Sequence, residues 1–119
     1  MAQHNITGSS GEQIAVKYFI EKGYLILHTN WRHKHWEVDI IASLKNKLHF
    51  IEVKTRWGNT FGNPEDDVSK KKIRNLINAA DEFLFMHPEW KHIQFDIISI
   101  SMQKDKAPDF YLIEDVYLP

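Results

Sequence analysis

Apolar and polar positions alternate along the chain in ways that predict both helices and strands. A helical spacing of apolar residues follows Gly8-Ser9-Ser10-Gly11, where either serine can cap a helix that begins at Glu12, and it stops at Gly23. Short runs rich in Ile, Val, Leu and Phe predict strands over residues 24–28, 38–44, 48–55, 92–101 and 109–113. The pattern therefore begins with one helix and continues with extended segments.

A second helix is predicted between the third and fourth strands. Its apolar stripe consists of Ile73, Leu76, Ile77, Ala80 and Leu84. Ser69 can cap its start and Pro88 lies beyond its end, after a loop over residues 57–64 that is rich in Gly, Asn and Pro. The order α-β-β-β-α-β-β indicates an α/β sandwich with a mixed sheet of about five strands flanked by helices.

The second and third predicted strands separate apolar from charged side chains. Because side chains alternate across a strand, Val38, Ile40 and Ala42 share one face, and Ile51 and Val53 share one face of the next strand. Both faces are wholly apolar and are expected to cover the core. The charged residues left on the opposite side are Glu37, Asp39, Glu52 and Lys54.

The turn between these two strands decides whether the charged side chains emerge together. Lys45-Asn46-Lys47 has the spacing of a tight hairpin. A turn of two or four residues within 44–49 would bring the acids of both strands to one face, whereas a three-residue turn would put them on opposite faces. We therefore predict a turn of even length.

Composition narrows the class of protein. The 119 residues, 43% hydrophobic and 26% charged, are typical of one globular domain over residues 1–119. A net charge of −1 argues against a protein that coats nucleic acid by bulk charge, so any such binding needs a local patch. There is no cysteine, no apolar signal-peptide segment and no apolar run near the ~20 residues of a membrane span. These features predict a cytoplasmic protein without a membrane partner.

The cluster of carboxylates needs a cation. Asp39 and Glu52 lie inside apolar runs, where an unpaired charge is costly. Mg²⁺ or Mn²⁺ prefers hard oxygen ligands, which these carboxylates and the carbonyl of Val53 can supply. Such an ion would neutralise the negative charge of a phosphodiester and lower the pKa of bound water. Lys54 could orient that water or stabilise the negative charge of the transition state. Glu37 could complete the ligand shell. The alternative is a solvated sheet face in which Glu37 and Lys54 form a cross-strand ion pair.

Basic and aromatic residues flank this cluster on both sides. Cations can contact phosphates and indoles can stack on exposed bases, as in the binding of single strands and distorted junctions. The candidate nucleic-acid-binding residues are Arg32, Lys34, Trp36, Arg56, Lys71 and Lys72. Alternatively, Trp31 and Trp36 belong partly to the core and the lysines form a solvated helix end. His33 and His35 lack a second pair at ligand spacing, which disfavours zinc. Asp96, within an apolar strand, is expected to be a structural hydrogen-bonding residue in preference to a distant support for the site.

Residues along almost the whole chain resemble a known family. Glu37-Val38-Asp39 followed by Glu52-Val53-Lys54 resembles the core of the PD-(D/E)XK nucleases. The closest resemblance is to the YraN-like proteins, an endonuclease-like group related to archaeal Holliday-junction resolvases. It rests also on Gly11-Glu12-x-x-Ala15, Gly23-Tyr24, Asn30-x-Arg32, Phe50-Ile51 before the Glu, Thr55-Arg56 after the Lys, Gly62-x-Pro64, Lys70 to Lys72 and Phe95-Asp96.

The resemblance implies a restriction-endonuclease-like sandwich and assigns roles. Asp39 and Glu52 would be metal ligands, Lys54 the catalytic lysine and Glu12 an additional acid from the first helix. From the sequence alone, Glu12 is an ordinary first-turn acid that favours the helix N-terminus. The family usually has Gly where this chain has Trp36, whose ring would narrow the approach to the site or stack on a base.

Two functions of different classes follow from the sequence. One is an Mg²⁺-dependent endonuclease acting on branched or single-stranded DNA, or on RNA, in DNA repair or recombination. The other is a non-catalytic accessory domain that binds nucleic acid or protein. The complete set of acids and lysine favours the endonuclease, because a binding module has no need of carboxylates that repel phosphate. A homodimer is a further expectation, because the binding surface of so small a domain is limited and resolvase relatives act as pairs.

Overall fold

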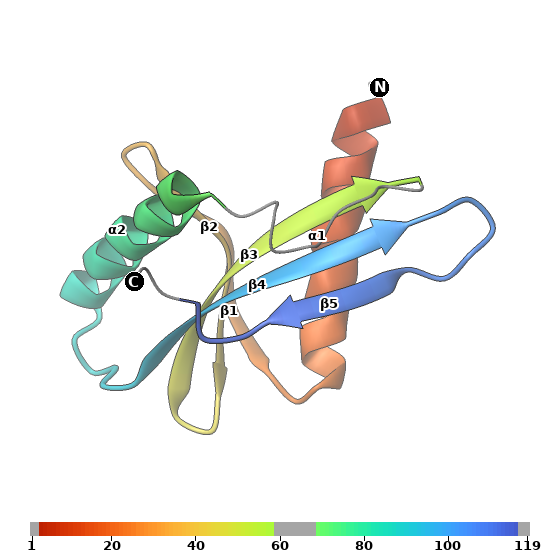
Figure 1. The fold of residues 1–119 in the computed structure, drawn as a ribbon. Helices are drawn as coiled ribbons and strands as arrows, with labels where there is room; N and C mark the ends of the chain where they lie inside the picture. Colours follow the sequence, from red (N-terminus) through yellow and green to blue (C-terminus); the bar gives the residue numbers. More distant parts are fainter. Residues whose placement is uncertain (1–2, 59–68, 117–119) are drawn as a thin grey trace.

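The fold is an α/β sandwich in which one helix packs on each face of a single sheet (Figure 1). The structure is a computed structural model that describes residues 3–58 and 69–116, with side chains from residue 11 onward. Its elements are α1 (Gln3–Glu21), β1 (Leu25–His33), β2 (Trp36–Leu44), β3 (Lys47–Trp57), α2 (Lys70–Met86), β4 (Ile93–Met102) and β5 (Asp109–Ile113). This is the predicted order α-β-β-β-α-β-β.

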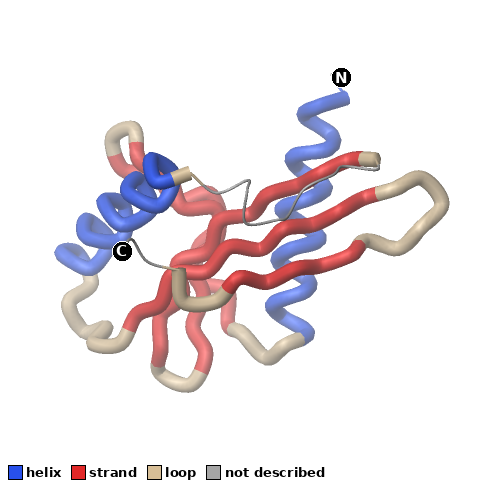
Figure 2. The backbone as a smooth tube through the Cα atoms, viewed as in Figure 1, coloured by secondary structure: helices blue, strands red, loops and turns tan. Residues whose placement is uncertain are grey.

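The sheet is mixed, as the sequence predicted. Its strands follow the chain in the order β1-β2-β3-β4-β5 (Figure 2), and β3 and β4 are parallel whereas the other neighbours are antiparallel. A parallel pair requires a crossover, which α2 provides. The helix is capped as expected, since the Ser69 hydroxyl accepts the N–H of Lys72 at 3.1 Å.

The turn between β2 and β3 has the predicted even length. Pairing runs from Leu44↔Lys47 to Ile40↔Ile51, which leaves Lys45 and Asn46 as a two-residue turn. Both residues have positive φ, 51° and 65°, as in the turns whose twist matches that of the flanking strands. The register prediction is therefore confirmed.

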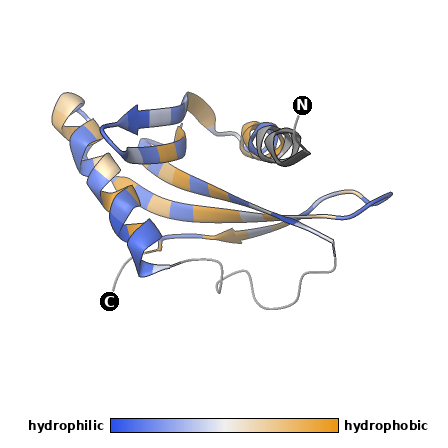
Figure 3. Cartoon of the chain, turned by 90° about the horizontal axis from the view of Figure 1, so that it is seen from above, coloured by the Kyte–Doolittle hydropathy of each residue, from blue (hydrophilic) through white to orange (hydrophobic). Residues whose placement is uncertain are grey.

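Both faces of the sheet are buried, whereas the sequence analysis placed the core on one face of the hairpin. On the first face, α1 contributes Ala15 and Phe19 to a cluster that also contains Ile40, Ala42, Ile51 and Ile98. On the second face, α2 contributes Leu76, Ala80 and Phe83 to a cluster with Ile41, Leu48 and Phe50. Figure 3 shows hydrophobic and hydrophilic bands alternating along the strands. Full burial of each large apolar side chain contributes about 1.5–3 kcal/mol.

Three local predictions were wrong. Helix α1 begins at Gln3, so residues 8–11 lie within it, because Gly and Ser only weaken a helix. Strand β1 continues to His33, because pairing with β2 extends to His33↔Trp36 and overrides the polar sequence. Val38 packs in the α2 cluster and not with Ile40, because its partner Trp31 on β1 lies against that cluster.

A buried polar network ties the far end of the sheet together. The Asp96 carboxylate is fully buried and lies 2.7 Å from Nδ1 of His49. It also accepts hydrogen bonds from the Gln94 side chain at 2.9 Å and from the backbone N–H of Asp115 at 3.0 Å. Asp96 therefore has the structural role that its position in the sequence predicted. In the described part of the chain, neither helix is long and apolar enough to cross a membrane.

Candidate active site between β2 and β3

The candidate site lies where β2 and β3 separate. Their pairing ends at Ile40↔Ile51, while β3 continues beside β4 as far as Trp57. Asp39 and Glu52 are the next residues beyond this last pair. The backbone N–H of Val53 donates to Oδ2 of Asp39 at 2.8 Å. A side chain thus replaces the strand partner that β3 loses at this point, and it holds the Asp39 carboxylate in the gap between the strands.

Asp39 is the electrostatic centre of the site. Burial raises its pKa from 3.8 to about 7, although the hydrogen bond from the Val53 amide acts in the opposite direction. The neighbouring carboxylates of Glu52, Glu12 and Glu37 raise it further. The structure therefore brings all four predicted acids within electrostatic range of one another, including Glu12 from α1.

Two lysines oppose this negative charge at Glu52. Burial raises the pKa of Glu52, while Lys72 and then Lys54 lower it and Glu37 raises it. Lys54 comes from β3, as predicted, and Lys72 from the first turns of α2. The sequence predicted Lys72 only as a nucleic-acid-binding residue, but the structure places it beside the carboxylates of Glu37 and Glu52.

A pocket of about 190 Å³ opens onto the site. It is lined by His35, Glu37, Glu52, Lys72, Asn75 and Leu76. Acids from β2 and β3 thus face a lysine and an amide from α2 across the same cavity. His35 and Asn75 were not predicted as site residues. For Asn75 a signal existed, because it lies three positions after Lys72 and therefore on the same helix face.

The other predicted contact residues differ in how far they are exposed to solvent. The Arg32 guanidinium is 3.5 Å from the Glu37 carboxylate, so Glu37 forms an ion pair with a residue of β1. Lys34 is exposed in the β1–β2 turn, and Lys71 is exposed on α2. Trp36 and Arg56 are half-buried, and Trp36 packs against the α2 cluster, as the alternative of a partly core residue predicted.

The described side chains offer a divalent cation at most two carboxylate ligands in one place. Among residues 11–58 and 69–116, no three His, Asp or Glu side chains already form a metal-holding group. The donor chemistry nevertheless fits a hard cation, since the partly buried carboxylate of Asp39 is destabilised by three others. Val53 offers a backbone oxygen, because the amide and carbonyl of a strand residue point to the same side.

Glu12 reaches the site because α1 approaches β3 closely. A Cβ atom added to Gly11 would lie 3.2 Å from Cβ of Thr55 and would overlap its hydroxyl. Only glycine permits this approach of the helix to the strand. The glycine of the Gly11-Glu12 motif therefore places the acid that follows it.

Gly11→Ala is expected to destabilise the protein by about 1–3 kcal/mol, because the overlap with Thr55 outweighs the ~1 kcal/mol that alanine usually adds to a helix. The free energy of unfolding in urea checks this for wild type, both single variants and Gly11→Ala with Thr55→Ala. The double variant should regain most of the loss. A single Gly11→Ala variant as stable as wild type would show that the close approach is not required.

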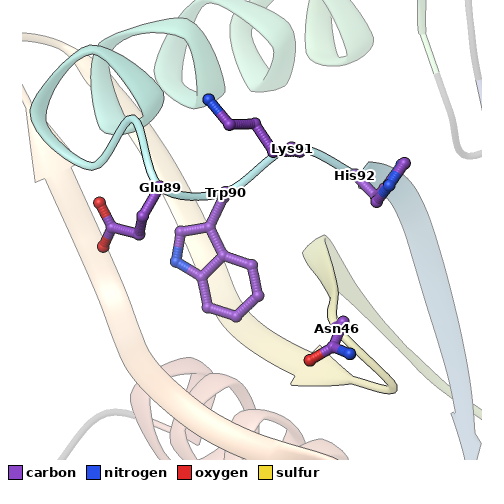
Figure 4. A pocket seen from close by; sticks show the side chains of 5 residues that line it. All are labelled: Asn46, Glu89, Trp90, Lys91 and His92. Carbon is purple, nitrogen blue, oxygen red and sulfur yellow. The ribbon is translucent and has the colours of Figure 1, made fainter.

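A larger pocket lies away from the carboxylates. It has a volume of about 400 Å³ and is lined by Asn46, Glu89, Trp90, Lys91 and His92 (Figure 4). These residues belong to the β2–β3 turn and to the segment between α2 and β4. None of the predicted site residues contributes to it, whereas the smaller pocket is lined by Glu37, Glu52 and Lys72.

Comparison with known proteins identifies relatives over nearly the full chain. A family model described as uncharacterised protein family UPF0102 matches residues 11–100. A UPF0102 protein of Phocaeicola vulgatus is 43% identical over 119 residues, covering 100% of this chain and 98% of the relative. A UPF0102 protein of Bacteroides thetaiotaomicron is 44% identical with the same coverage. The matched range includes every residue of the candidate site.

Proposed function

The chain belongs to the uncharacterised protein family UPF0102, the family of the YraN-like proteins, and we propose that it is a metal-dependent endonuclease of the PD-(D/E)XK type. It would hydrolyse phosphodiester bonds in nucleic acid, with branched or single-stranded DNA as the favoured substrate. Such a substrate would connect it with DNA repair or recombination.

One observation carries this proposal. Three carboxylates from α1, β2 and β3 lie close enough to the partly buried Asp39 to raise its pKa, which burial and these neighbours together bring to about 7. Such an arrangement is unfavourable in a protein without a positively charged ligand, because the like charges repel one another. Strongly raised pKa values in a cleft are typical of functional sites.

Asp39, Glu52 and the carbonyl of Val53 would hold Mg²⁺ or Mn²⁺. When bound, the ion would neutralise negative charge on a phosphodiester and lower the pKa of water. It would also remove the repulsion that raises the pKa of Asp39. The hydrogen bond from the Val53 amide fixes one carboxylate oxygen and leaves the other available.

The side chains of the chain itself would bind and orient the substrate. Lys54 and Lys72 lie close enough to Glu52 to lower its pKa, so their ammonium groups can attract a phosphate to the same place. Glu12 and Glu37 would accept protons or hold water beside Asp39. Asn75, in the wall of the pocket, can donate to a phosphate oxygen.

Cleavage of labelled nucleic acids tests this function. Four-way junction, flap, single-stranded DNA and RNA are incubated with Mg²⁺ or Mn²⁺ and with wild type, Asp39→Asn or Glu52→Gln. Each substitution is expected to lower the rate at least about 100-fold, because it removes a charge from the metal site. Glu89→Gln, a change of an exposed acid outside the site, should cleave like wild type.

Two results would contradict the proposal. The first is that wild type cleaves no member of the panel with either ion, which would favour the non-catalytic accessory domain. The second is that both site variants cleave at the wild-type rate, which would assign the activity to a contaminant.

A further inference from the structure

The β1–β2 hairpin carries a ladder of stacked rings next to the candidate site. The ring of Trp31 stacks on His33 with centroids 6.2 Å apart and planes at 11°. His33 in turn stacks on Trp36 with centroids 6.5 Å apart and planes at 21°. His35 contacts the other end of the ladder, 5.0 Å from Trp36. We call these four rings the hairpin ladder.

The inner end of the ladder is fixed to the core. Trp31 meets Phe83 of α2 edge to face at 5.4 Å, and Phe83 is almost fully buried. Nε2 of His33 lies 3.4 Å from the carboxylate of Glu82, also on α2. The tip of the hairpin lies beside α2 in Figure 1. The rings are therefore held in place before any ligand arrives.

The outer end of the ladder is open to solvent and charged. His35 and Lys34 are exposed in the two-residue turn that follows His33, and Nζ of Lys34 lies 5.8 Å from the ring of Trp36. His35 also lines the 190 Å³ pocket together with Glu52 and Lys72. One residue thus belongs both to the ladder and to the wall of the candidate active site.

Core packing alone explains only part of this arrangement. Trp31 and Trp36 do pack against the α2 cluster. However, burial does not require an exposed histidine against the outer indole with a lysine beside it. An aromatic ring with a lysine beside it is the kind of surface on which nucleic-acid bases stack while their phosphates are neutralised.

We propose that the hairpin ladder binds an unpaired nucleotide, whose base stacks at the Trp36–His35 end and whose phosphate enters the pocket lined by Lys72. Bases inside a duplex are already stacked on their neighbours and cannot reach these rings. The ladder therefore selects single strands, flaps and loops over continuous duplex. This inference deepens the proposed function by naming the residues that select an unpaired strand, and its link to cleavage rests on that function.

Binding without metal tests the ladder separately from catalysis. Fluorescence anisotropy is measured in EDTA with a labelled oligothymidylate and with a blunt duplex of the same length. Trp36→Ala is expected to weaken single-strand binding about 5- to 150-fold, the range for loss of one stacked base, with duplex binding unchanged. Trp36→Phe, which keeps a ring, should retain most of the affinity. Phe85→Ala removes an aromatic side chain that is 84% exposed on α2 and should have no effect.

The outcomes separate this inference from the nuclease proposal. Two results would overturn the proposed role of the hairpin ladder even if the protein cleaves DNA. One is equal affinity of wild type and Trp36→Ala for the single strand, and the other is an equal loss of affinity for the single strand and the duplex. The expected pattern would support the ladder even if no cleavage is found. If Trp36→Ala does not fold, as judged by circular dichroism, His35→Ala replaces it, because His35 is exposed. This variant should lose single-strand affinity about threefold or more, and an unchanged affinity would overturn the proposal.

Discussion

Asp39→Asn is expected to stabilise the metal-free protein at pH 8 by up to about 4 kcal/mol, the free energy that corresponds to raising the pKa of Asp39 from 3.8 to about 7. The pKa of Asp39 rises from 3.8 when unfolded to about 7 when folded, mainly through burial. Between these values the folded state binds more protons, so stability falls as the pH rises from about 4 to 7. Asparagine carries no charge, and its amide oxygen can still accept the N–H of Val53.

Urea unfolding in EDTA at pH 5 and pH 8 measures this effect. Wild type should lose stability between the two pH values, and Asp39→Asn should lose much less. Mg²⁺ or Mn²⁺ at pH 8 should restore the stability of wild type but not raise that of the variant, because binding to the folded state alone stabilises it. Glu89→Gln serves as the control for removal of an exposed acid. A variant no more stable than wild type at pH 8 would show that the Asp39 carboxylate is not strained by its surroundings.

The hairpin that carries Asp39 and Glu52 could be predicted because its information is local. Alternation of side chains fixes the faces of a strand, and Asn46 suits the positive φ of a two-residue turn. The register that brings the two acids together follows from these features alone. The Ser69 cap of α2 is equally local, since it involves only the next three residues.

The remaining part of the site depends on contacts between distant segments. Lys72 and Asn75 reach the pocket only because α2 crosses over the sheet and packs on Ile41 and Phe50. The side of the sheet on which a crossover helix lies follows from strand order and from the right-handedness of such crossovers, and strand order is not contained in any local pattern. Val38 was misplaced for the same reason, since its burial is decided by its pairing with Trp31 on β1.

The buried polar pair at the other end of the sheet shows the same limit. Asp96 stands out in an apolar strand, so its structural role was predictable. Its partner His49 was not, because the parallel register that sets β3 beside β4 joins residues far apart in the chain. Sequence thus shows which residue needs a partner more readily than which residue provides it.

Lys54→Ala is expected to lower the rate of phosphodiester cleavage about 100- to 1000-fold, the usual cost of removing one group that stabilises transition-state charge. Lys54 lies on β3 on the same face as Glu52 and lowers its pKa, which places its ammonium group near the proposed cation and phosphate. Single-turnover kinetics on the substrate that wild type cleaves best would measure the chemical step directly.

Lys72→Ala is the matched comparison, because Lys72 also lies near Glu52 but comes from the wall of the pocket on α2. If Lys54 acts on the reacting phosphate and Lys72 on substrate binding, the first substitution should lower kcat and the second should mainly raise KM. Both variants should keep the stabilisation by Mg²⁺ or Mn²⁺, which shows that the metal ligands are intact. Cleavage by Lys54→Ala within about threefold of the wild-type rate would remove Lys54 from the catalytic groups and leave Lys72 as the cation that serves the site.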